Sequence, residues 1–161
     1  MLFPRSIVLT LLLALVPAAA SAWPASIISV HDGDIVTVAP CGDTSTPIVI
    51  RLYGIDAPET KQKGGLDSTT LLRRLLPEGS SVELIPQDVD RYGRTVAIIM
   101  ADGSCINARM VEAGQAWVYS RYCRAKTCKN WQKLQKQAQQ KRAGLWEEKD
   151  PTPPWKWRKE K

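Results

Sequence analysis

Apolar and polar residues alternate along the first two thirds of the chain, a pattern typical of half-buried β-strands. Isoleucine and valine residues gather on both sides of an Asp32-Gly33 turn, which predicts a β-hairpin. The other alternating segments are bounded by Gly, Pro, Asn and Asp, the residues that favour turns. The predicted strands are 27–30, 35–38, 48–55, 82–85 and 95–100, with a short strand around 105–106 after a turn at 101–104.

Three other segments carry apolar residues at helical spacing. The first is a leucine stripe over 71–76, which Ser68 can cap and a following proline ends. The second is short, with Asn107 as its cap and Gly114 as its stop, and the third covers about 129–142. One helix precedes the fourth strand and two follow the fifth. This order predicts an α+β fold in which a closed five-stranded β-barrel carries three α-helices.

The first 22 residues predict a secretory signal peptide, because Arg5 precedes an apolar run over 7–16 and small residues lead to Ala22. That run is shorter than the roughly 20 residues of a membrane-spanning helix, which favours cleavage before Trp23 over an uncleaved anchor. We therefore expect a secreted or periplasmic protein with no stable membrane association after cleavage. The mature chain is long enough for one domain, which we place at 23–148.

The last segment, 149–161, is rich in proline, tryptophan and basic residues, and we call it the tail. Proline disfavours helix interiors and central strands, so we predict an extended tail. Two interpretations of Trp155 and Trp157 stay open. With the basic residues between them they could stack on nucleic acid, or they could pack back onto the domain.

The formal net charge of +6, or +5 once the signal peptide is removed, favours approach to polyanions and equally explains solubility. In an exported protein an even number of cysteines indicates disulfides. Cys123 and Cys128 are separated by only four residues, so we predict a bridge between them, which leaves Cys41 to pair with Cys105. A zinc site is the rival interpretation, but the chain has a single histidine, His31, and no Cys-x-x-Cys pair.

Three short motifs place acids and arginines where predicted strands end. They are His31 to Asp34, Arg51 to Glu59, and Asp90 to Arg94. Asp34 and Asp56 offer hard anionic oxygens that suit calcium or magnesium, and two like charges at close range favour a cation between them. Glu59 is a spare carboxylate that can orient water, and a carboxylate alone is a weak base, so a metal must share in activating that water.

Arg51 and Arg94 each offer a bidentate fork to the oxygens of a phosphate, which lysine could not supply. The plain alternative is that Arg94 is a surface turn residue and that Arg51 only pairs with Glu59 or Asp34. Together the acids and both arginines predict metal-assisted hydrolysis of a phosphodiester.

At this point the motifs show a family resemblance. The three motifs are followed by Ala101-Asp102-Gly103, Asn107 and Val111-Glu112-Ala113-Gly114. In order and separation they resemble the thermonuclease family, the staphylococcal-nuclease-like OB-fold nucleases, over about residues 26–146. The resemblance implies an OB-fold barrel that holds calcium on Asp34, Asp56 and the carbonyl oxygen of Ala57. Ala57 stands where a threonine is expected, a change that a main-chain ligand tolerates.

The resemblance also assigns catalytic roles. It implies that Arg51 and Arg94 contact the phosphate and that Glu59 is the acid–base residue. It places aromatic rings beside the nucleotide at Tyr92 and Tyr122, with Tyr119 as an alternative to Tyr122.

The implied reaction is endonuclease cleavage of DNA and RNA at the 5′ P–O bond, with 3′-phosphoryl products and little sequence specificity. We expect a monomer whose partner is the nucleic acid substrate. One alternative is a non-catalytic nucleic-acid-binding module on the same fold, which the presence of the acids and both arginines disfavours. Another is a calcium-dependent adhesion or inhibitor module, which would bind calcium without releasing nucleotides.

Overall fold

The computed structural model describes residues 22–42, 46–124 and 126–160. The expected signal peptide, apart from Ala22, lies outside the described residues. Within the described ranges, no helix has both the length and the apolar character needed to cross a membrane.

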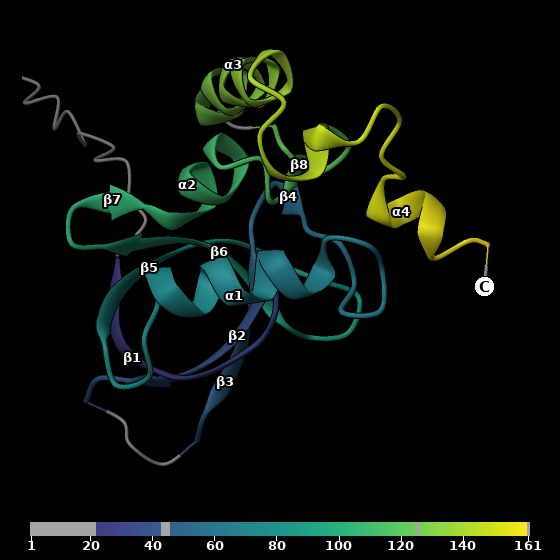
Figure 1. Ribbon diagram of the computed structural model, residues 1–161. Helices are drawn as coiled ribbons and strands as arrows, with labels where there is room; N and C mark the ends of the chain where they lie inside the picture. The colour runs from purple at the N-terminus through teal and green to yellow at the C-terminus, as the bar shows by residue number, and fades with distance from the viewer. Residues whose placement is uncertain (1–21, 43–45, 125, 161) are drawn as a thin grey trace, which may run out of the picture.

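Five strands close into a barrel, shown in the lower left of Figure 1. They are β1 (Trp23–Asp32), β2 (Ile35–Pro40), β3 (Ile48–Leu52), β5 (Ser81–Val89) and β6 (Thr95–Ala101). Neighbours in the order β3-β2-β1-β5-β6 are antiparallel, and a parallel pairing between β3 and β6 closes the sheet. The predicted five-stranded OB-fold barrel is therefore confirmed. Alternate side chains fill its interior, among them Val36, Val38, Ile50, Leu52, Leu84 and Ile99.

The predicted strand 48–55 is two strands rather than one. The chain turns at Gly54, whose φ of 70° is in the left-handed region that glycine adopts at little cost. After this turn β4 (Ile55–Asp56) pairs with β8 (Trp117–Val118) in a separate two-stranded sheet, and β7 (Ser104–Cys105) extends the barrel beside β6. The break carries Asp56 out of the barrel wall toward the helices.

The three predicted helices are present with shifted ends, as α1 (Gly65–Leu75), α2 (Ile106–Glu112) and α3 (Lys126–Gln140). A short 3-10 helix, η1 (Gly144–Glu147), follows them. In Figure 1, α1 lies across the barrel while α2 and α3 lie above it. Neither predicted cap residue caps its helix: the Ser68 hydroxyl donates to the carbonyl of Gln115, and Asn107 turns into the core.

The buried Asn107 side chain joins barrel and helices. Its amide nitrogen donates to the carbonyl of Tyr53 at 3.0 Å, and its amide oxygen accepts the Ile99 N–H at 3.0 Å. One side chain thereby fixes the exit of β3 against β6.

The expectation of an extended tail is wrong, because residues Pro154–Trp157 form one helical turn, α4. Proline is compatible with the first turn of a helix, where its missing N–H would have no partner in any case. Trp155 contacts the rings of Trp117 and Tyr119 on the domain, so the interpretation in which the tail packs back is confirmed.

The cysteines give one predicted bridge and one correction. Cys123 and Cys128 form a disulfide, whereas Cys41 and Cys105 are free thiols. Cys41 follows β2 and Cys105 lies in β7, so strands β1, β5 and β6 separate them. Strands are about 4.8 Å apart, and a disulfide joins Cα atoms within roughly 7 Å. Pairing Cys41 with Cys105 as the two remaining cysteines took no account of this separation.

Candidate active site

Asp34 is held in the turn between β1 and β2 by the backbone of another segment. Its side chain is buried, with the residue 3% exposed, and Oδ2 accepts the N–H of Ala57 at 2.9 Å. A Cβ at Gly33 would lie 2.6 Å from the Cβ of Ala57 and 2.7 Å from that of Ser68. Glycine is therefore required for close packing here, and that packing brings Asp34 to Ala57.

Arg51 joins the two predicted metal-binding aspartates. From β3 its Nη1 donates to Oδ1 of Asp34 at 3.1 Å, and its Nη2 donates to Oδ1 of Asp56 at 2.7 Å. Asp56, on β4, is 0% exposed. The pairing with Asp34 that we considered as an alternative is therefore present, and it also brings in Asp56.

Burial and the close approach of charges shift the pKa values of residues in this cluster. Burial raises the pKa of Asp34 to about 8, and the charges of Asp32 and Asp56 add to the shift while Arg51 opposes it. Burial alone would lower the pKa of Arg51, but the two aspartates reverse the effect and raise it. Two buried carboxylates at close range require a cation, and one guanidinium is shared between them.

Glu59 lies three residues beyond Asp56, and its side chain is 39% exposed at the rim of the cluster. Pro58 precedes it and restricts the intervening backbone. Oε1 of Glu59 accepts a hydrogen bond from Nη1 of Arg158 at 2.8 Å, and the same arginine donates to both oxygens of Asp56. Asp34, Arg51, Asp56 and Glu59 therefore lie in one connected group.

Arg158, which bridges Asp56 and Glu59 in this group, is the residue of the site that the sequence did not predict. It comes from the tail, about a hundred residues after Glu59, and no motif connects the two. Its carboxylate partners raise its pKa against the opposing effect of burial. The only hint in the sequence is a basic residue that follows a Pro-Pro-Trp segment.

Within the described residues, no hydrogen bond or ion pair joins Arg94 to Asp34, Asp56 or Glu59. It lies at the β5–β6 turn, where Nε donates to Oδ2 of Asp90 at 2.7 Å. Burial raises the pKa of Asp90, but hydrogen bonds from Arg94 and the Tyr92 backbone outweigh it and lower the pKa. Because Thr95 pairs with Ile50, the residue before Arg51, the register sets Arg94 beside the strand that carries Arg51.

The predicted aromatic residues lie at two places on the surface. Tyr92 is exposed in the β5–β6 turn, with the guanidinium groups of Arg91 and Arg94 over its ring. Tyr122 is also exposed and meets Tyr119 edge to face, with ring centroids 5.0 Å apart. The ring of Tyr119 itself is stacked with Trp155.

The donor chemistry fits a hard cation. Asp34 and Asp56 supply buried carboxylate oxygens that already attract two guanidinium groups, and the resemblance adds the carbonyl oxygen of Ala57. Across the described ranges, no group of three or more His, Cys, Asp or Glu side chains forms a metal cluster. Any cation here must therefore complete its shell with main-chain oxygens, water or substrate.

Comparison with known proteins agrees with this geometry. Residues 49–148 match the family model described as staphylococcal nuclease homologue. An uncharacterized endonuclease of Escherichia coli O157:H7 is 40% identical over 147 residues, covering 86% of this chain and 92% of that protein. The micrococcal nuclease of Shigella flexneri is 34% identical over 157 residues, covering 92% and 87% of the two chains.

A closed OB-fold barrel with acids and an arginine clustered at its strand ends defines a nuclease-type domain, and the chain belongs to the staphylococcal nuclease family. It is therefore a nuclease, an enzyme that hydrolyses phosphodiester bonds, and nucleic acid is its substrate.

Proposed function

We propose that this protein is a secreted or periplasmic, calcium-dependent endonuclease. It cleaves DNA and RNA with little sequence specificity, leaves 3′-phosphoryl ends and acts as a monomer. The observation that carries the proposal is the cluster in which Arg51 joins Asp34 to Asp56, with Glu59 linked to Asp56 through Arg158. Apart from Arg158, these residues come from the β1–β2 turn, β3, β4 and the loop that follows.

The cation would be held by Asp34, Asp56 and the carbonyl of Ala57. Calcium bound there supplies positive charge for a phosphate oxygen and acidifies a water molecule. The chain's own groups do the rest. In this mechanism Arg51 donates to a non-bridging phosphate oxygen, which gains negative charge as the water oxygen attacks phosphorus.

In this mechanism Glu59 takes the proton from that water. Its exposure at the rim leaves it accessible, unlike the two buried aspartates. As the new P–O bond forms, the bond from phosphorus to the 5′ oxygen breaks. The leaving 5′ oxygen takes up a proton from solvent and becomes a 5′ hydroxyl, while the phosphate stays on the 3′ side. Arg94 supplies the second guanidinium, and Tyr92 and Tyr122 offer ring faces to bases of any identity.

Digestion assays test this proposal. Single-stranded DNA, duplex DNA and RNA are incubated with the protein and calcium, and then with EGTA. We expect degradation of all three with calcium and none with EGTA. Because Glu59 is partly exposed, Glu59→Gln should fold normally and lose activity, and it serves as the matched inactive control. Survival of full activity in EGTA or in Glu59→Gln would contradict the proposed mechanism.

The ends of the products test the cleaved bond. If the 5′ P–O bond breaks, fragments carry a 5′ hydroxyl that polynucleotide kinase labels directly. Their 3′ phosphate blocks extension by a polymerase until phosphatase removes it. Products that extend without phosphatase would place the cut on the other side of phosphorus.

Export and oligomeric state have separate tests. A mature amino terminus at Trp23, measured by mass spectrometry of protein from the periplasm or medium, would match the expected signal peptide. That cut leaves β1 intact, because β1 begins at Trp23. Light scattering should give the mass of a monomer.

A further inference from the structure

The tail covers the candidate catalytic centre with a guanidinium group. Nη2 of Arg158 donates to Oδ2 of Asp56 at 2.7 Å, and Nη1 donates to Oδ1 of Asp56 at 3.2 Å and to Glu59 at 2.8 Å. Since Arg51 also donates to Oδ1, both oxygens of Asp56 are engaged by arginines. Arg158 therefore occupies both oxygens through which Asp56 would bind a cation, and one of the two oxygens, Oε1, through which Glu59 would meet water.

The formal charges favour exchange with a divalent ion. When all three carboxylates are ionised, Asp34, Asp56 and Glu59 face Arg51 and Arg158, which leaves the group with one excess negative charge. When Arg158 leaves, the excess becomes two, the charge that a divalent cation neutralises. Arg158 and a divalent cation therefore offset the same excess negative charge of the carboxylates, each in the absence of the other.

A second contact of the tail lies where a base is expected. The rings of Trp155 and Tyr119 are parallel, 1° apart, with their centroids separated by 5.0 Å. Tyr119 is one of the two tyrosines considered as the second base platform. A flat ring stacked on it occupies the position that a nucleobase would take.

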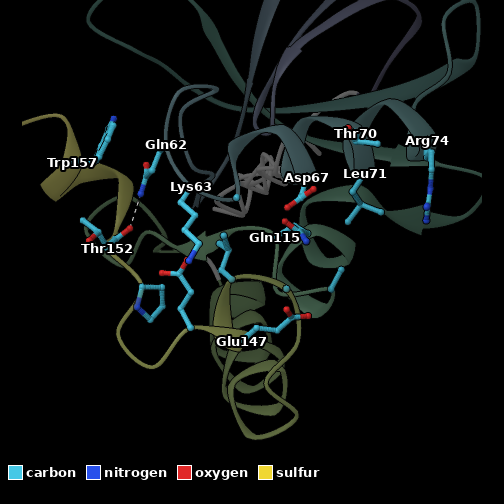
Figure 2. A pocket seen from close by; sticks show the side chains of 16 residues that line it. Gln62, Lys63, Asp67, Thr70, Leu71, Arg74, Gln115, Glu147, Thr152 and Trp157 are labelled. Carbon is cyan, nitrogen blue, oxygen red and sulfur yellow. Dashed lines mark hydrogen bonds and ion pairs between the residues drawn. The ribbon is translucent and has the colours of Figure 1, made fainter.

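The tail is attached in a way that allows release. The side chain of Gln62 donates to the carbonyl of Thr152 at 2.6 Å, as the dashed line in Figure 2 shows. Thr152 and Trp157 also line a cavity of ≈ 900 Å³, which extends to α1 and η1, so this stretch is not packed on all sides. The helix α4 is a single turn, too short to be stable without the contacts it makes.

We propose that the tail is an intramolecular inhibitor that occupies the active site of this nuclease. Arg158 competes with the divalent cation for Asp56 and Glu59, and Trp155 competes with a substrate base for Tyr119. Binding of cation and nucleic acid displaces the tail, so the enzyme stays closed where free calcium is scarce. This inference rests on the proposed calcium-dependent nuclease function.

Calcium titration of the purified protein tests the competition without measuring activity. Arg158→Gln removes the competing charge, and Lys156→Gln removes an equal charge from an exposed position in α4, two residues before Arg158. If the tail is docked for nine tenths of the time, its removal should tighten apparent calcium binding about tenfold. Isothermal titration calorimetry should show this gain for Arg158→Gln and wild-type affinity for Lys156→Gln. Equal or weaker binding in Arg158→Gln would overturn the proposal.

Displacement of Trp155 is a second readout. Protein labelled with 5-fluorotryptophan gives separate ¹⁹F resonances, and the signal lost in Trp155→Phe identifies Trp155. Calcium should shift that resonance toward the value of exposed fluorotryptophan in the wild type. Saturation with calcium while the resonance stays in place would show that the tail does not move, and would overturn the proposal.

Kinetics separate an inhibitory arginine from a catalytic one. We expect Arg158→Gln to cleave faster than wild type at limiting calcium and equally fast at saturating calcium. A lower turnover at saturating calcium would make Arg158 a phosphate contact and overturn the inhibitory role. If wild type binds calcium and loses activity in EGTA but Arg158→Gln binds no tighter, only this inference fails. If wild type binds no calcium, the proposed function fails as well.

Discussion

Two arginines reach the same carboxylate, Asp56, from parts of the molecule that are built differently. Arg51 is fixed within the barrel wall, because β3 pairs with β2 on one side and with β6 on the other. Arg158 follows a single helical turn, and its side chain is more exposed than that of Arg51. The comparison teaches that a similar contact can be permanent or exchangeable, depending on what holds the backbone behind it.

The largest difference between the two arginines should appear when each becomes lysine. Lysine keeps the charge but loses the fork, so Arg51→Lys should reduce turnover about 10²–10³-fold at saturating calcium. Arg158→Lys should leave that rate unchanged and weaken only the hold of the tail. Initial rates on single-stranded DNA measure both. A similar loss of rate in both variants would erase the distinction between them.

The rigidity of the barrel side depends on Asn107, which links Tyr53 to β6. Asn107→Ala removes the acceptor of the buried Ile99 N–H and a donor to the buried Tyr53 carbonyl, and it should cost about 2–3 kcal/mol of unfolding free energy. Urea denaturation measures it. Asn130→Ala, on an exposed face of α3, is the matched control and should change stability by less than about 0.5 kcal/mol. Equal effects would mean that Asn107 does not stiffen the site.

The tail should be easier to detach than any strand. Trp155→Ala removes the ring contacts with Trp117 and Tyr119 and should lower global stability by no more than about 1.5 kcal/mol. Trypsin cleavage after Lys149 should become faster in this variant, as followed by mass spectrometry. Trp155→Phe, which retains a ring, should lie nearer wild type. Unchanged cleavage would show that Trp155 does not hold the tail.

The smallest effect concerns the β5–β6 turn, where Asp90 orients Arg94. The folded pKa of Asp90 lies below its ordinary value, so its ionised form stabilises the fold at neutral pH. That contribution should disappear as pH falls through the folded pKa. Asn can still accept the backbone N–H bonds, so Asp90→Asn isolates the charge. The stability gap between wild type and this variant should close between about pH 5 and about pH 2. A constant gap would contradict it.

The sequence allowed the barrel to be predicted because its strands alternate with a period of two and each lies between turn residues. It also placed Asp34, Arg51, Asp56 and Glu59 within motifs at strand ends, where chains converge. The break at Gly54 was missed because the apolar alternation continues through it. The positions of Cys41 and Cys105 depend on sheet order, which cysteine counting does not include.

The contacts of the tail could not be predicted for a different reason. Arg158 meets Asp56 and Glu59 across about a hundred residues, and its position depends on where Trp155 finds a ring to pack on. Proline content favours an extended segment, but Pro154 starts a helix because the first helical position needs no N–H. Local sequence patterns predict the backbone conformation of such a segment poorly, and they do not predict which surface it packs against.

Gly54 connects the covalent state of the protein to its chemistry. A Cβ at this position would lie 2.6 Å from Sγ of Cys123 and 3.0 Å from the ring of Trp131, so the bridged cysteine rests directly on the turn between Arg51 and Asp56. The Cys123–Cys128 disulfide thus supports the turn that sets the relative positions of Arg51 and Asp56. Reduction of the bridge removes this support, so we expect a looser centre in chains whose thiols stay reduced.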